Sequence, residues 1–368
     1  MLEWLSSGPT GLLAGSLLGL VLGVFFEDML KKRVKSAGKL LRRWTRRSRS
    51  APDLNREFKL GALRAPCVIV EGDGEHEIDR DRVRVLVNPV QVRLPDELSE
   101  WRDDVAREQA RRKAAGDSHA WNGANFAVDD LIISRAGPQE LPEVTLVLKY
   151  SDYFTFLATQ QLDRRLPGGA TPRTRYLEGR ELSQIPDFMR SGFGLNMAVV
   201  TSDDWLLVSR RSSRVVTGKR QWNSSANEGL SRDKDSADGL PPDLFEAARR
   251  GLREELQLSA GRYDLHLLAF HVVTSLSQWG ALFLAQLGDL RRDDLQDHLS
   301  RGVEDGWEHP EFDFVSFDPE SSIRYLLRED RIGEWAPAAP VLIYLSLVNA
   351  FGRAAVDEAA DRVLREAK

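Results

Sequence analysis

The sequence contains a single cysteine, Cys67, among its 368 residues, and this excludes an internal disulfide framework. The near absence of cysteine fits a reducing compartment. The six histidines show no metal-ligand spacing with one another or with Cys67, so the pattern does not indicate a zinc site. Internal repeats are also absent, and no low-complexity tract occurs beyond a basic stretch near the N-terminus.

The chain after residue 50 has no excess of positive charge. Residues 1–50 carry ten Lys/Arg and three acids, a net charge of +7, which leaves −12 for the rest of the chain. The basic end favours an anionic surface, whereas the acidic body argues against a general nucleic-acid binder. Hydrophobic residues make up 42% and charged residues 29% of the chain, enough for one large or two ordinary globular domains.

Charged residues are missing altogether from residues 4–26. A helix of this length would span about 34 Å, enough to cross a hydrocarbon core of roughly 30 Å. A cleaved signal peptide is the alternative, but the run has no basic start, and Val24, Phe25 and Phe26 stand where small residues would precede cleavage. The sequence therefore predicts a single transmembrane helix, with residues 1–30 as the anchor.

Four glycines recur every fourth residue within this predicted span: Gly11, Gly15, Gly19 and Gly23. They fall on one helix stripe and would let helices pack closely, which predicts a homo-oligomer; the alternative is that glycine is simply common in membrane helices. Residues 31–54 form a basic juxtamembrane collar and linker expected to attract anionic membrane lipids. The positive-inside rule places the N-terminus outside and the soluble domain in the cytoplasm.

Residues 55–190 are an N-terminal extension of the soluble part, and no motif in them indicates a function. Short strands are predicted at residues 67–70, 83–87 and 144–149. A helix is predicted over residues 96–113, with acidic residues in its first turn.

Two apolar runs at residues 195–201 and 205–209 flank a polar turn and predict a hairpin. Basic residues and one tryptophan follow, and they are the candidate ligand-binding residues: Arg210, Arg211, Arg214, Lys219, Arg220 and Trp222. Guanidinium groups bind phosphates through paired hydrogen bonds, so this cluster could contact a nucleotide. A solvated basic loop is the alternative.

A helix is predicted over residues 244–256, beginning after Asp243. Its apolar stripe consists of Phe245, Ala248, Leu252 and Leu256. Glu254 and Glu255 project from one turn, and neighbouring carboxylates of this kind are a candidate site for Mg²⁺ or Mn²⁺. A solvated helix face is the alternative.

These residues resemble the Nudix family, in which a strand hairpin and a glycine-bearing turn precede a helix with the pattern Arg-Glu-apolar-x-Glu-Glu. The matching residues here are Gly229, Arg250, Leu252, Glu254 and Glu255. The departures are Gly251 in place of the first helix Glu, Asp235 in place of an earlier Glu, Gln257 in place of a late glycine, and a longer loop.

The resemblance implies an α+β fold, with a mixed sheet flanked by helices over residues 191–368. Gly251 cannot hold a metal ion, so the hydrolytic site looks incomplete; Gly251→Glu should then improve hydrolysis. The alternative is that another acid substitutes for the missing one, with Asp235, Asp243 and Glu304 as candidates.

An anchor joined to a divergent Nudix-like domain resembles the transmembrane-NUDIX effectors of bacterial cyclic-oligonucleotide antiphage systems (CBASS). This resemblance implies an inner-membrane effector that binds a cyclic nucleotide and disrupts the membrane by helix assembly. The alternatives are a membrane-tethered Nudix pyrophosphatase acting on a nucleoside diphosphate derivative, and a scaffold without a ligand.

Overall fold

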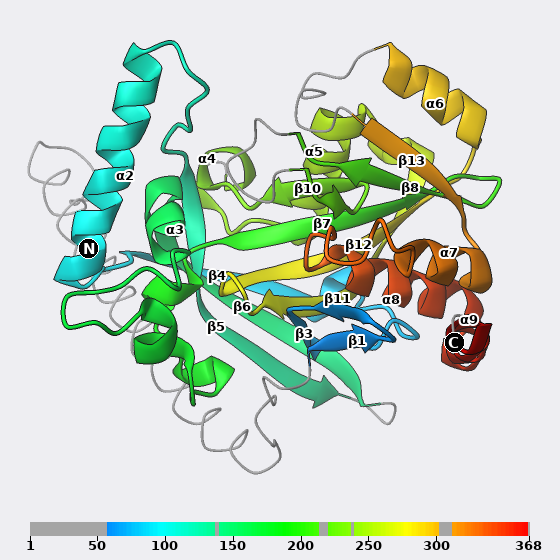
Figure 1. Ribbon diagram of the computed structural model, residues 1–368, viewed down its shortest axis with the longest axis horizontal. Coiled ribbons are helices and arrows are strands. Elements are labelled where there is room, and N and C mark those ends of the chain that lie inside the picture. The colour runs from blue at the N-terminus through cyan, green and yellow to red at the C-terminus, as the bar shows by residue number, and fades with distance from the viewer. Residues whose placement is uncertain (1–56, 137–139, 213–219, 237–238, 302–310, 367–368) are drawn as a thin grey trace, which may run out of the picture. The chain divides into compact units, whose positions relative to one another are not determined.

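The computed structural model describes residues 57–136, 140–212, 220–236, 239–301 and 311–366 (Figure 1). The segment from Pro52 to Lys368 makes one compact unit. The predicted membrane span with Gly11, Gly15, Gly19 and Gly23, and the basic collar, lie outside the described residues.

The sequence predicted a single-pass inner-membrane protein, and the helices of the described residues contradict this prediction. None of these helices is both long and apolar enough to cross a membrane. Helix α8 (Ala339–Phe351) is apolar, but its 13 residues span only about 20 Å. Helix α2 (Asp96–Ala114) has 19 residues but is rich in charge. The membrane location is therefore not carried further.

The largest sheet has the strand order β13-β8-β7-β12-β11-β3, with β10 paired to β7 and β9 paired to β8. Its strands are β3 (Cys67–Glu71), β7 (Phe193–Val200), β8 (Trp205–Arg210), β9 (Trp222–Asn223), β10 (Ala226–Gly229), β11 (Tyr263–Val273), β12 (Gln278–Leu287) and β13 (Glu311–Ser316). Strands β7 and β12 are parallel, and every other pair is antiparallel. The α+β class predicted from the sequence is confirmed.

Each face of this sheet is covered by a different set of helices. Successive side chains of a strand point to opposite faces, and on β7 Met197 belongs to one core cluster while Ala198 belongs to the other. Helix α5 (Leu244–Leu256) packs on β7 and β10 within the first cluster. Helix α8 packs on β7 and β12 within the second, beside α7 (Pro319–Leu326) and α9 (Arg353–Glu366).

The segment before residue 190 builds a second sheet of order β4-β6-β5 and also extends the first one. Its elements are β1 (Phe58–Leu60), β2 (Leu63–Ala65), β4 (Val83–Gln91), α2, β5 (Ala124–Ala136), β6 (Leu141–Asp152) and α3 (Tyr153–Thr159). Strand β3 pairs with β11, so this segment contributes an edge strand to the sheet that holds the predicted Nudix-like region. Its core residues, such as Phe126, are continuous with those around α5.

The remaining helices are short. They are α4 (Arg232–Asp235), α6 (Arg292–Ser300), 3-10 turns at Arg80–Arg82, Leu182–Gln184, Asp187–Arg190 and Ala260–Arg262, and a π turn at Arg173–Leu177. The predicted strands at 67–70, 83–87 and 144–149, the hairpin, and the helices at 96–113 and 244–256 are all confirmed. Gln257 follows the last residue of α5 and has a left-handed conformation, with φ 54°, a position that favours glycine.

Candidate functional site

Helix α5 places Arg250, Glu254 and Glu255 against β10 and α4. Its first turn is capped by the Asp243 carboxylate, which accepts hydrogen bonds from the backbone of Phe245 and Glu246. Such a cap satisfies amide groups that the helix itself leaves unpaired. The apolar stripe packs into the core, so Arg250 and Glu254, one turn apart, lie along the edge of the buried face.

Arg250 ties three segments together with one buried guanidinium group, whose side chain is only 7% exposed. It donates two hydrogen bonds to Asp235 of α4, at 2.7 and 2.8 Å. It also pairs with Glu228 of β10 at 2.7 Å and with Glu254 at 3.2 Å. Its last contact is a donation to the carbonyl of Gly229 at 3.2 Å. Burial alone would lower the pKa of Arg250, but Asp235 and Glu228 raise it well above its usual range.

The candidate metal ligands Glu254 and Glu255 are both occupied by other groups. Glu254 accepts a hydrogen bond from Lys234 at 2.8 Å as well as from Arg250. Burial would raise the pKa of Glu254, but Lys234 and Arg250 outweigh it and hold the pKa below its usual value. Glu255 is buried, and both of its carboxylate oxygens accept from the backbone N–H of Asn227, at 2.9 and 3.1 Å.

Gly251 lies directly against β10, and this contact explains why the position has no side chain. A Cβ atom there would meet the Cβ of Glu228 and the Cε of Met197, each at 2.8 Å. That separation is shorter than real Cβ contacts allow, so larger residues would displace the strand or its side chains. By contrast, a Cβ at Gly229 would meet nothing within 4 Å.

Glu228 is the functional candidate that the sequence analysis missed. It lies on β10, directly opposite Gly251. Gly251 is the helix position at which the Nudix pattern has a glutamate. Burial raises the pKa of Glu228 to about 7; Arg250 opposes this shift, and the neighbouring Glu255 adds to it. In the sequence, Glu228 is marked only by its position immediately before Gly229. The helix pattern does not include this residue and so did not identify it.

The expected Mg²⁺ or Mn²⁺ does not fit the carboxylates as they are arranged. Within the described ranges, no group of three or more His, Cys, Asp or Glu side chains could hold a metal ion. Of the candidate substitute acids, Asp235 pairs with Arg250, and Asp243 pairs with Arg80 at 2.6 Å. Glu304 lies outside the described residues.

The candidate ligand-binding residues do not gather beside the α5 carboxylates. Trp222 is 4% exposed and belongs to the core cluster on the other face of the sheet. Arg331 lies 3.4 Å from the centre of its ring, and Arg210 lies over the same ring at 5.2 Å. Arg210 also pairs with Glu311 at 3.1 Å. Trp222 therefore contributes to packing.

The other members of the basic cluster lie at or beyond the end of β8. Arg211 and Arg220 are joined by a backbone hydrogen bond of 3.1 Å, and Arg220 has a positive φ of 62°. Arg214 and Lys219 lie outside the described residues. Contact between this cluster and a nucleotide stays a prediction.

Because the pKa of Glu228 is raised, we expect the stability of the protein to depend on pH. The folded protein holds this proton up to about pH 7, whereas an ordinary Glu loses it near 4.5, so unfolding releases a proton between these values. The contribution of Glu228 to stability is therefore lost as the pH rises through this window. Against a Glu228→Gln variant, the wild type should lose about 1–3 kcal/mol of unfolding free energy between pH 4.5 and 7.5.

Urea denaturation of both proteins at a series of pH values measures this difference. Taking the difference between the two proteins cancels the titration of the acids that do not interact with Glu228. A constant difference across the pH range would contradict the assigned protonation of Glu228.

The comparisons with known proteins come from solved structures alone, because no protein-family model and no curated protein matches the sequence. The chain is similar to protein DR0079 from Deinococcus radiodurans, with 16% identity over 42% of this chain and 81% of that chain, at a TM-score of 0.30. It is also similar to a MutT protein from Methanosarcina mazei Go1, with 17% identity over 48% and 95% of the two chains, at a TM-score of 0.26. At these identities and TM-scores the two likenesses say nothing of what this chain does.

Proposed function

We propose that the Nudix-like region binds a nucleotide and does not hydrolyse it efficiently. The observation that supports this proposal is the closed ion-pair network on α5. Arg250 and Lys234 occupy Glu228, Asp235 and Glu254, and Asn227 occupies Glu255. A metal-dependent hydrolase would need several of these carboxylates open toward a metal ion and its activated water.

The position of Gly251 adds a second reason for slow turnover. Restoring the acid that the family carries there would require Glu228 and Met197 to move, because a Cβ already approaches both within 2.8 Å. Opening the cluster instead would separate Arg250, which is 7% exposed, from its partners. Breaking a buried ion pair is costly, since it leaves uncompensated charge away from water.

Within this proposal the ligand is a cyclic oligonucleotide, in line with the resemblance to CBASS effectors. The chain would act as a sensor, and a sensor that spares its ligand sustains the signal. Membrane disruption is not part of the proposal.

Incubation of the full-length chain with Mg²⁺ tests the proposal, using a cyclic dinucleotide and ADP-ribose as probes. The expected result is binding, followed by calorimetry, with slow or no turnover, followed by chromatography. Glu255→Gln should leave this outcome unchanged, as should the control Glu246→Gln on the exposed part of the same helix. Rapid Mg²⁺-dependent hydrolysis that is lost in Glu255→Gln and kept in Glu246→Gln would overturn the proposal.

A second candidate function is a pyrophosphatase acting on a nucleoside diphosphate derivative. The observation in its favour is the pKa of Glu228, near 7, which suits a group that accepts and returns a proton at neutral pH. In that case Glu228 would replace the acid missing at Gly251. Turnover of ADP-ribose by the wild type that falls at least a hundredfold in Glu228→Gln would establish this function.

A further inference from the structure

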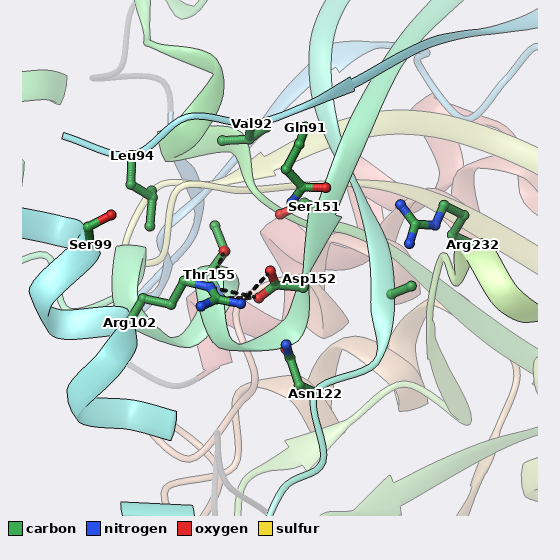
Figure 2. A pocket seen from close by; sticks show the side chains of 11 residues that line it. Gln91, Val92, Leu94, Ser99, Arg102, Asn122, Ser151, Asp152, Thr155 and Arg232 are labelled. Carbon is green, nitrogen blue, oxygen red and sulfur yellow. Dashed lines mark hydrogen bonds and ion pairs between the residues drawn. The ribbon is translucent and has the colours of Figure 1, made fainter. Parts of the chain in front are cut away.

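A cavity of about 490 Å³ opens beside α4, on the side of the N-terminal extension (Figure 2). Its size falls within the range of small-molecule sites. Its walls come from β4, α2, β5, β6, α3 and α4, and its polar lining includes Arg102, Asn122, Ser151, Asp152, Thr155 and Arg232. Figure 2 shows Arg102 and Arg232 on opposite sides, with Ser151 and Asp152 between them.

The fixed charges of the cavity leave one unbalanced cation. Arg102 pairs with Asp152 at 2.9 Å and also donates to the hydroxyl of Thr155. Asp152 in turn accepts the backbone N–H of Thr155 at 2.8 Å, as the cap of α3. The Arg102–Asp152 pair is therefore neutral and closed, and Arg232 supplies the net positive charge.

Arg232 is held by the face of its guanidinium group rather than by its edges. The group stacks over the ring of Tyr150, 4.4 Å from the ring centre. Among the described residues, no carboxylate pairs with Arg232, and no acceptor takes a hydrogen bond from it. A stacked guanidinium keeps its N–H donors directed outward in its plane, where they match two oxygens of an anion.

Asn122 supplies a second polar group on the cavity wall. Its amide oxygen accepts the backbone N–H of Phe154 at 2.9 Å, which leaves its NH2 group as a donor. The hydroxyl of Ser151, in contrast, is shielded from solvent and has no partner within the described part of the chain, so a molecule in the cavity does not reach it.

We infer that this cavity binds the phosphate of a small phosphate ester, with Arg232 as the phosphate ligand and the NH2 group of Asn122 as a donor to its hydroxyl or phosphate oxygens. This inference rests on the proposed function and gives it a location. Helix α4 supplies Arg232 to the cavity, while Asp235 and Lys234 of the same four residues bind Arg250 and Glu254. A ligand held by Arg232 thus lies next to the α5 cluster.

Calorimetry on the full-length chain tests the inference with AMP, ribose 5-phosphate and inorganic phosphate as probes. We expect AMP to bind, and its affinity to fall at least tenfold in Arg232→Gln and at least threefold in Asn122→Asp, which keeps the acceptor for Phe154 and removes the NH2 donor. Affinity should also fall as salt is raised, because the contact is charged. The matched control Arg253→Gln, on the exposed face of α5, should bind like the wild type. Thermal unfolding of each variant identifies any that has lost its fold.

The probes separate the possible phosphate sources. Equal affinity for AMP and ribose 5-phosphate would support a sugar-phosphate site, and tighter binding of AMP would support a nucleotide site. Nucleotide binding that is unchanged in both Arg232→Gln and Asn122→Asp would overturn the inference and leave the proposed function standing. Failure of every phosphate probe and of the cyclic dinucleotide to bind the wild type would overturn both.

Discussion

Replacing Arg250 with alanine should destabilise the protein by about 3–5 kcal/mol, the typical cost of removing one partner of a buried ion pair. The substitution leaves Asp235, whose side chain is 4% exposed, without the guanidinium that neutralises it. Glu228 and Glu254 lose the same partner. Asp235 and Glu254 would then lie beside Glu228, whose pKa is already raised to about 7, and among the described residues Lys234 is the one remaining cation paired with this group, through Glu254.

Urea denaturation at pH 7 measures this loss, with two companion variants. Arg253→Ala removes an exposed arginine from the same helix and should change the unfolding free energy by less than about 0.5 kcal/mol. Arg250→Lys keeps the charge but not the planar fork, so it should recover only part of the loss. A loss below about 1 kcal/mol in Arg250→Ala would contradict the stabilising role assigned to the ion pairs of Arg250.

The secondary structure around Arg250 was predictable because it depends on residues close together in the sequence. The stripe of Phe245, Ala248 and Leu252 fixes both the helix and its buried face, and the structure gives the helix the predicted bounds. Strand β5 was not predicted, and its bulge between Val128 and Asp130 interrupts the alternation that would have shown it. Helix α8 was also not predicted; it is buried on nearly all sides and so lacks a polar face.

The site was less predictable because its contacts join distant segments. The helix pattern identified Arg250, Glu254 and Gly251, but only the pairing of β10 with β7 brings Glu228 against that helix. Sequence spacing likewise grouped Arg210 with the candidate ligand contacts, whereas its strand position directs it over Trp222 on the opposite face of the sheet. The cavity beside α4 combines residues 91–155 with Arg232, and no local pattern links them.

Gly251→Glu should destabilise the protein by about 3 kcal/mol or more, which revises the expectation that this change simply improves hydrolysis. Its Cβ would come within 2.8 Å of Glu228 and Met197, and overpacking of this kind costs about 1–3 kcal/mol. The new carboxylate would also be buried beside Glu228 and Glu255, where like charges disfavour ionisation. Better helix propensity returns only about 1 kcal/mol.

Exchanging the two residues, Glu228→Gly with Gly251→Glu, should recover at least half of that loss. The exchange keeps the number of acids and removes the Cβ that obstructs position 251. The double variant Glu228→Gln with Gly251→Glu is the matched control, because glutamine relieves the charge but keeps the obstructing Cβ. Unfolding free energies of the wild type, the single variants Glu228→Gly and Gly251→Glu, and the exchange variant give the coupling between the positions, expected at about 1–3 kcal/mol. Equal recovery in the two double variants would show that charge, rather than space, excludes an acid at position 251.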